Sequence, residues 1–168
     1  VEVLHASSFF FFYKGSPYQS LLHKLKYQGK KNIGIRMGRL FAAELIETSF
    51  SQSEIIIPVP LHPKKQKKRG YNQSEMLAMG MNELFGIELN TKVLLRKGNA
   101  SSQTNKNRYD RYLNIADQFC IENSERIQGK SILLIDDVVT TGSTLEACAQ
   151  LLMEAGSKDI SILTLAIA

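Results

Sequence analysis

Two adjacent aspartates, Asp136 and Asp137, follow a run of four apolar residues, 132–135, that has the composition of a buried strand. Small and hydroxyl-bearing residues then lead to Thr144, where a helical pattern begins. Ligands of open α/β sheets bind at the carboxyl ends of strands, so a site is expected at this point. The two acids would repel a phosphate, but they suit sugar hydroxyls or a divalent cation.

The residues after the two acids suit a phosphate. Backbone N–H groups and hydroxyls at a helix N-terminus favour an anion, as does the helix dipole, and Gly142 allows close approach of the backbone. The alternative is that Asp136 and Asp137 are a helix-capping pair and that the Thr/Ser residues after them simply form a turn. We favour a binding site, because two adjacent acids after a buried strand require desolvation that a plain turn does not justify. A P-loop is excluded, since the segment has no Gly-Lys-Ser/Thr ending.

The stretch ILLIDDVVTTGST, residues 132–144, resembles the phosphoribosyl pyrophosphate (PRPP) signature of type I phosphoribosyltransferases. The resemblance implies that Asp136 and Asp137 bind the ribose 2′ and 3′ hydroxyls, that the next loop holds the 5′-phosphate, and that magnesium binds on the pyrophosphate near the two acids. Purine-salvage members typically have an aspartate at the position of Thr140, so the threonine counts against purine salvage. The substrate-binding residues implied by the signature are Val138, Val139, Thr140, Thr141, Gly142, Ser143 and Thr144.

Three further stretches are similar to the ComF (ComFC) competence family, so the resemblance covers essentially the whole chain. They are LLHKLKYQGKKNIG, IIIPVPLHPKKQKKRGYNQSEMLA and SSQTNKNRYDRYLNIADQF. The resemblance implies that Val59, Pro60 and Leu61 form the pyrophosphate loop and that residues 96–116 form a mobile lid over the site. Family members usually carry a four-cysteine zinc module ahead of this region, and the present sequence contains none.

Five of the six residues 64–69 are basic, and they follow the Pro58-Val59-Pro60 strand end closely. They are interpreted in three ways: as neutralising a pyrophosphate, as gripping a nucleic-acid backbone, or as a solvated charged loop. The best single pyrophosphate contact is Arg69, because the Gly-Tyr-Asn turn after it would hold it near the sheet. The candidates for single-stranded DNA are Lys64, Lys65, Lys67 and Lys68.

The lid contains polar and basic side chains, among them Gln103, Lys106, Arg108 and Arg111. They could close over pyrophosphate, stabilise its charge as the bond to ribose breaks, and exclude water. The alternative is a disordered loop with ordinary charges. We assign Gln103 to substrate binding, and Arg108 to catalysis together with Asp136, Asp137 and Arg69.

Strands and helices alternate along the chain. Strands are predicted over residues 1–13, 55–57, 93–95, 132–135 and 160–168, helices over 21–27, 33–48, 72–85 and 143–154, and a basic loop over 61–70. This order predicts an α/β fold, with an open, mostly parallel, twisted sheet flanked by helices. The resemblance implies the type I phosphoribosyltransferase fold, as a single domain over residues 1–168 with a small N-terminal hood at 1–30.

The composition fits one ordinary domain, with 168 residues of which 43% are hydrophobic. A net charge of +5 favours anionic partners without choosing between nucleotides and nucleic acids. The two cysteines, Cys120 and Cys148, lack disulfide or metal-ligand spacing, so we expect free thiols in a reducing cytoplasm. No stretch approaches the roughly 20 apolar residues of a membrane span.

Three functions are consistent with these features. The first is a magnesium-dependent transferase, in which pyrophosphate leaves the sugar and an unknown acceptor attacks. The second is a DNA-uptake protein that binds single-stranded DNA through its basic residues. The third is a sensor that binds PRPP without turnover. For all three functions, a homodimer is considered as the assembly of the protein.

Overall fold

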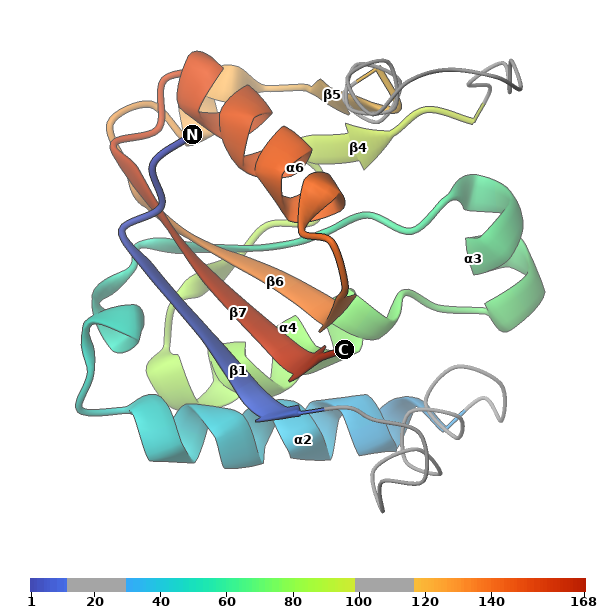
Figure 1. The fold of residues 1–168 in the computed structure, drawn as a ribbon, viewed down its shortest axis with the longest axis vertical. Coiled ribbons are helices and arrows are strands. Elements are labelled where there is room, and N and C mark those ends of the chain that lie inside the picture. The colour runs from blue at the N-terminus through green and yellow to red at the C-terminus, as the bar shows by residue number, and fades with distance from the viewer. Residues whose placement is uncertain (12–29, 99–116) are drawn as a thin grey trace.

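The computed structural model describes residues 1–11, 30–98 and 117–168. Their main feature is a five-stranded sheet in the order β1-β7-β6-β2-β3, with every pair of neighbours parallel (Figure 1). The strands are β1 (His5–Phe11), β2 (Ile55–Pro58), β3 (Glu88–Leu89), β6 (Ser131–Val139) and β7 (Asp159–Ile167). The predicted α/β class, with a mostly parallel sheet, is therefore confirmed.

Helices cover both faces of the sheet. Helices α2 (Lys31–Leu45) and α4 (Gln73–Phe85) lie on one face, and α6 (Ser143–Glu154) lies on the other (Figure 1). Ile56 and Leu133 pack in the core under α2 and α4, whereas Ile55 and Ile132 pack in the core under α6. This two-sided burial explains why β2 and the first half of β6 are continuous apolar runs in the sequence.

Helices α2 and α4 approach each other closely through two glycines. A Cβ added to Gly38 would lie 2.1 Å from the carbonyl oxygen of Leu77, and one added to Gly80 would lie 2.1 Å from that of Ile35. No side chain fits at either position without separating the helices. Gly38 and Gly80 therefore set the position of α4, whose N-terminus reaches the carboxyl ends of the strands.

Strand β6 extends beyond the predicted residues 132–135 and contains both aspartates. Its pairing with β2 stops at Pro58 and Ile135, but its pairing with β7 continues to Val139 and Ile167. Pro58 and Pro60 end β2 because a proline cannot donate to a sheet ladder. Beyond Ile135, β6 therefore has a strand neighbour on one side only within the described part of the chain, and this leaves space for a site.

A smaller antiparallel sheet pairs β4 (Leu94–Arg96) with β5 (Phe119–Ile121). The strand predicted over 93–95 is confirmed, but its partner was not predicted. Arg96, the first residue of the predicted lid, is the last residue of β4. Residues 99–116, which make up most of that lid, lie outside the described residues.

The basic residues expected in a loop form a short helix, α3 (Pro63–Arg69), so the loop prediction was wrong. The Nδ1 atom of His62 accepts a hydrogen bond from the Lys64 N–H at 3.2 Å, and Pro63 occupies the first turn. Gly70 ends the helix with a φ of 81°. No residue of α3 is buried. Helix periodicity therefore could not reveal it, whereas the two ends carry recognisable signals.

The N-terminal hood interpretation needs a correction. Residues 5–11 do not stand apart from the sheet, because β1 pairs in parallel with β7 from His5 with Ser161 to Phe11 with Ile167. The strand is long enough to form a complete edge of the main sheet. Residues 12–29 of the predicted hood, including the helix expected at 21–27, lie outside the described residues. Among the residues that the structure describes, no helix is long and apolar enough to cross a membrane.

Candidate functional site

The carboxyl ends of β2 and β6 open into a cavity of about 190 Å³, called here the strand-end cavity. It brings together residues from the loop after β2 and from α3, α4, β4, β6 and α6, which are far apart in the sequence. The lining residues are Val59, Pro60, Leu61, Lys65, Arg69, Asn72, Gln73, Ser74, Arg96, Asp136, Asp137 and Thr144. The structure thus places the predicted acids, the predicted loop 59–61 and Arg69 around one space.

Both aspartates are half-buried and held by backbone and side-chain donors. Oδ1 of Asp136 accepts hydrogen bonds from the Asp137 N–H at 2.8 Å and from Oγ of Ser74 at 2.9 Å. Oδ1 of Asp137 accepts one from the Val138 N–H at 2.8 Å. These bonds fix the carboxylates in orientation, which suits them to recognise a ligand hydroxyl or a cation.

The N-terminus of α4 connects the two strand ends. The Nδ2 group of Asn72 donates to the carbonyl of Val59 at 2.9 Å, and its Oδ1 accepts from the Ser74 N–H at 3.2 Å. Ser74 in turn holds Asp136. Asn72 and Ser74 are buried, so their polar groups require these partners. Sequence reasoning missed both residues, although Asn72 directly before a helical pattern is a typical N-cap signal.

Arg96 is a second functional candidate that the sequence did not single out. Its Nη2 group donates to Oε1 of Gln118, and its guanidinium carbon lies 5.1 Å from the centre of the Phe119 ring. Burial lowers its pKa, while the charge of Asp136 acts to raise it. Its Nε atom is buried and has no hydrogen-bond partner among the described residues. Arg96 is therefore a cation that Gln118 and Phe119 hold in place, and its Nε–H group has no acceptor among the described residues.

Arg69 reaches the same cavity from α3. Its Nη1 group donates to Oε1 of Gln73 at 2.8 Å, and the Nε2 atom of Gln73 is buried without a hydrogen-bond partner among the described residues. Lys65, four residues before Arg69, also lines the cavity. Lys64, Lys67 and Lys68 are exposed and do not line it. The basic cluster is thus divided between a cavity face and an outer face.

The residues between the aspartates and α6 occupy three kinds of position. Val138 and Val139 are still in β6, and their side chains pack against the two cores, so ligand contacts from them would come from the backbone. Gly142 caps α6 with a φ of 78°, a conformation that strongly favours glycine. Thr144, in the first turn of α6, lines the strand-end cavity.

The remaining residues of the signature form the turn before α6. Thr140 and Thr141 are exposed, and Oγ1 of Thr141 lies 3.1 Å from Oγ of Ser143. They stand beside the helix N-terminus as the sequence predicted. Gln103, Lys106, Arg108 and Arg111 lie outside the described residues.

Cys148 lies in α6, buried in the core behind the cavity. Burial raises its pKa far above the ordinary value of a thiol, the charge of Asp136 raises it further, and Arg96 opposes this. Cys148 therefore remains a neutral thiol. The expected buried, unpaired state is confirmed for Cys148, whereas Cys120 is free but half-buried.

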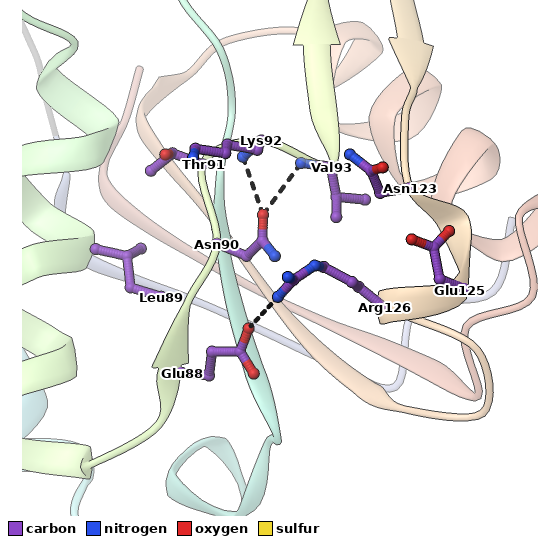
Figure 2. A pocket seen from close by; sticks show the side chains of 9 residues that line it. All are labelled: Glu88, Leu89, Asn90, Thr91, Lys92, Val93, Asn123, Glu125 and Arg126. Carbon is purple, nitrogen blue, oxygen red and sulfur yellow. Dashed lines mark hydrogen bonds and ion pairs between the residues drawn. The ribbon is translucent and has the colours of Figure 1, made fainter.

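A second polar cavity, of about 450 Å³, lies at the β3 edge of the main sheet and is called here the edge cavity (Figure 2). Its lining includes Glu88 and Arg126, which form an ion pair at 3.9 Å. Oδ1 of Asn90 accepts hydrogen bonds from the N–H groups of Lys92 and Val93, at 2.9 and 3.1 Å. Three side chains of the edge cavity, those of Glu88, Asn90 and Arg126, are thus bonded within the protein.

Residues 73–167 match the family described as the phosphoribosyl transferase domain. This match extends over more than half of the chain and includes the aspartates and the turn into α6. The chain belongs to the phosphoribosyl transferase domain family. The family assignment explains why the strand end of β6 and the N-terminus of α6 lie at one cavity.

Curated relatives place the chain near the competence proteins of this family. It is 29% identical over 150 residues to the DNA utilization protein YhgH of Shigella flexneri, covering 87% of this chain and 65% of that protein. It is 29% identical to competence protein F of Haemophilus influenzae, covering 89% and 68%. It is 37% identical to competence protein ComFC of Streptococcus pneumoniae, covering 76% and 54%. The resemblance to the ComF family is confirmed, and the chain spans about 65% of the length of the YhgH proteins.

Solved structures of phosphoribosyl transferase proteins share the fold. The glutamine phosphoribosylpyrophosphate amidotransferase from B. subtilis superposes with a TM-score of 0.57 at 15% identity, covering 84% of this chain and 30% of that one. A hypoxanthine phosphoribosyltransferase from Staphylococcus aureus superposes with a TM-score of 0.52 at 14% identity, covering 92% and 73%. At these identities the likeness establishes the fold alone.

Proposed function

We propose that the chain binds phosphoribosyl pyrophosphate, together with Mg²⁺, in the strand-end cavity. The observation that carries the proposal is the juxtaposition of two held carboxylates with three cations, Lys65, Arg69 and Arg96, around one space. A sugar that bears a phosphate at one end and a pyrophosphate at the other needs both kinds of group. Carboxylates accept from hydroxyls, and cations neutralise phosphate oxygens.

The arrangement supports a definite division of roles. Asp136 and Asp137 suit the ribose hydroxyls, because a phosphate next to them would be repelled. The turn of Gly142 and the first residues of α6 suit the 5′-phosphate, since backbone N–H groups and the helix dipole favour an anion there. The pyrophosphate then belongs beside the loop 59–61, within reach of the cations from α3 and β4.

The described residues fit Mg²⁺ bound mainly through the ligand. They contain no group of three or more His, Cys, Asp or Glu side chains that could hold a metal by themselves. Mg²⁺ commonly keeps several waters and uses one or two carboxylates plus substrate phosphates, and Asp136 and Asp137 are the carboxylates at this cavity. When bound, the ion would neutralise charge on the pyrophosphate.

The same residues support transfer of the sugar to an acceptor. When the bond between C1 and pyrophosphate breaks, negative charge grows on the leaving group, and Arg69 and Arg96 are placed to stabilise it. Arg96 does this with little reorganisation, because Gln118 and Phe119 already hold it. A sensor that binds PRPP without turnover is the alternative, and it would use the same cavity.

Calorimetric titration with PRPP and MgCl₂ tests the binding proposal. We expect saturable binding by the wild type and at least a roughly hundred-fold weaker affinity for Asp136→Asn/Asp137→Asn, since hydrogen bonds to charged groups contribute about 1.5–3 kcal/mol each. Asp117→Asn, at an exposed residue away from the cavity, is the matched control and should bind like the wild type. Unaltered binding by the double variant would reject the assignment, as would absence of binding to the wild type.

A role in handling single-stranded DNA during uptake, in the cytoplasm, is the second candidate function. It is favoured by helix α3, whose outer lysines Lys64, Lys67 and Lys68 are exposed with no acidic residue among them. The names of the competence relatives agree with this role. Replacing the three lysines by glutamine should reduce the salt slope of DNA affinity by about 2, from a slope of roughly 0.7 per phosphate neutralised. An unchanged slope would show that the outer lysines of α3 do not contact DNA.

A further inference from the structure

The two edges of the main sheet differ in length and in charge. Strand β3, at one edge, has two residues, and its Glu88 is paired with Arg126. Strand β1, at the other edge, has seven residues, and none of them is Lys, Arg, Asp, Glu or Pro. In Figure 1, β1 lies at the margin of the sheet, on the far side of β7 from β6. Proteins usually block long edge strands with charges or prolines, because such strands pair readily with others, and β1 has neither block.

The backbone of β1 has hydrogen-bonding groups along its outer edge. The Leu4 N–H donates to the carbonyl of Ile160, just ahead of the β1–β7 ladder, at 2.8 Å. Bonds from one strand to a parallel neighbour come from alternate residues, so the N–H and C=O groups of His5, Ser7 and Phe9 point away from β7. Among the described residues, no strand pairs with this outer edge. A strand that docks here therefore gains main-chain hydrogen bonds.

Exposed apolar side chains stand at both ends of this edge. Leu4 directly precedes β1 and is 56% exposed, and Phe11 ends β1 and is 76% exposed. Ile167, the partner of Phe11 in β7, is 37% exposed. Between the two ends, residues 6–8 have the small side chains of alanine and two serines. The edge thus combines a middle that allows close approach with apolar ends whose burial is favourable.

Helix α2 extends this apolar surface on one face of the sheet. It packs on β1, since the rings of Phe41 and Phe9 stack with their centres 4.9 Å apart. Gly38 faces α4, and Leu40 lies about 200° around the helix from it, on the side away from α4. Leu40 is 57% exposed. The outer edge of β1 together with Leu4, Phe11, Leu40 and Ile167 is called here the β1 strip.

The β1 strip is complementary to a second copy of itself. In an antiparallel pair of β1 strands related by a two-fold axis, the Phe11 end of each copy lies on the Leu4 end of the other. With Ser7 at the axis, Phe11 lies opposite Val3, and the pairing covers both apolar ends of both copies. Charge favours the same contact. The net charge of +5 repels a second copy, whereas residues 3–11 contain no Lys, Arg, Asp or Glu, so copies approach there at least cost.

We infer that the β1 strip is the surface on which two copies of the chain associate, with their β1 strands paired antiparallel into one continuous sheet. The pairing is isologous, so each copy contributes the same residues and the assembly closes as a dimer. The two α2 helices then lie on the same face of the joined sheet, with their Leu40 side chains turned toward the seam. No residue of β1 lines the strand-end cavity, so the inference goes beyond PRPP binding and does not depend on it.

Sedimentation velocity of the intact chain over a range of protein concentrations tests the inference. We expect reversible dimers that form as the concentration rises. Phe11→Lys should weaken the dimer at least about ten-fold, because it removes an apolar contact at each end of the pair and places a charge on the paired edge. Leu84→Lys is the matched control, since it also replaces an exposed apolar side chain by lysine, but on α4 outside the strip. It should dimerise like the wild type.

Hydrogen exchange tests whether the backbone of β1 forms the contact. The amides of His5, Ser7 and Phe9 should exchange more slowly in concentrated samples than in dilute ones, because the partner strand accepts their hydrogen bonds. The Leu89 amide, in β3 at the opposite edge of the sheet, is the internal control and should exchange at the same rate in both samples.

Urea unfolding of each variant verifies its fold. Ala6→Lys, at an exposed residue of the same edge, replaces Phe11→Lys if that variant does not fold. A monomer at every concentration would overturn the inference. So would a dimer that Phe11→Lys forms as tightly as the wild type, or β1 amides whose exchange does not depend on concentration. PRPP titration of the same samples reports separately on the strand-end cavity.

Discussion

The strand-end cavity and the edge cavity are both lined by charged and amide side chains, but only the strand-end cavity contains buried donors without a hydrogen-bond partner among the described residues. In the edge cavity Glu88 is paired with Arg126 and the Asn90 amide is bonded to two N–H groups (Figure 2). In the strand-end cavity Nε of Arg96 and Nε2 of Gln73 are buried without a hydrogen-bond partner among the described residues. A buried donor without a partner lowers the stability of the fold by about 1–3 kcal/mol, and a ligand that accepts its hydrogen bond offsets this loss.

A polar lining alone does not identify a binding site. In the strand-end cavity, neighbouring residues hold the polar side chains in orientation. Arg96 and Gln73 nevertheless each keep a donor that has no partner among the described residues. Arg96 is supported by Gln118 and Phe119, and Asp136 by Ser74. This combination is the preorganisation that ligand binding requires.

The largest expected effect comes from Arg96→Met, which keeps an unbranched apolar side chain but removes the guanidinium group that lies over Phe119. The affinity for PRPP with Mg²⁺ should fall about 10- to 100-fold, because a charge-assisted contact is lost. The free energy of unfolding should stay the same or rise, since a buried donor without a partner is removed. Arg126→Met in the edge cavity is the control and should leave PRPP affinity unchanged. If Arg96→Met bound PRPP as tightly as the wild type, the unpartnered donor of Arg96 would not be a ligand contact, and the proposed difference between the two cavities would be wrong.

A smaller effect is expected behind the strand-end cavity, where Cys148 has a raised pKa. In the unfolded chain the thiol ionises near pH 8.5, whereas in the folded chain it stays protonated. The folded state therefore binds more protons at high pH, and its stability falls as the pH rises. Between about pH 8.5 and about pH 9.5 the wild type should lose about 1 kcal/mol relative to Cys148→Ala, measured by urea unfolding. A difference that is independent of pH would mean that water reaches the thiol.

The smallest effect is expected from breaking the ion pair of the edge cavity. The side chains of Arg126 and Glu88 are 62% and 48% exposed, so their attraction is screened by solvent. A double-mutant cycle with Glu88→Gln and Arg126→Gln should give a coupling free energy of about 0.5 kcal/mol or less, by urea unfolding. A coupling several times larger would show that the edge cavity is more organised than its exposure indicates.

The sequence was most informative where periodicity and ligand chemistry agreed. The predicted helix over 143–154 coincides with α6, and the acids lie where a strand meets open space, as expected. The predicted helix over 72–85 corresponds to α4, which Gly86 ends with a φ of 67°. These features are local, because they depend on the residue types within one or two turns of chain.

The features that could not be predicted depend on contacts between distant parts of the chain. β1 joins the edge of the main sheet through β7, a pairing that its own aromatic residues do not specify. Arg96 becomes part of the cavity because β4 pairs with β5, and Phe119 of β5 and the preceding Gln118 support its side chain. Ser74 meets Asp136 across 62 residues of sequence. Each case requires the tertiary fold, whereas sequence patterns report only near neighbours.

Helix α3 is fixed by its two ends and not by a core. His62 and Gly70 cap it, and none of its residues is buried. Substitutions of its outer lysines therefore leave the packed interior untouched, and surface changes of this kind usually alter stability by no more than about 0.5 kcal/mol. The charge of this helix can therefore be changed almost independently of folding, whereas a change at Asp136 would also remove the hydrogen bonds that Ser74 and the Asp137 N–H donate to it.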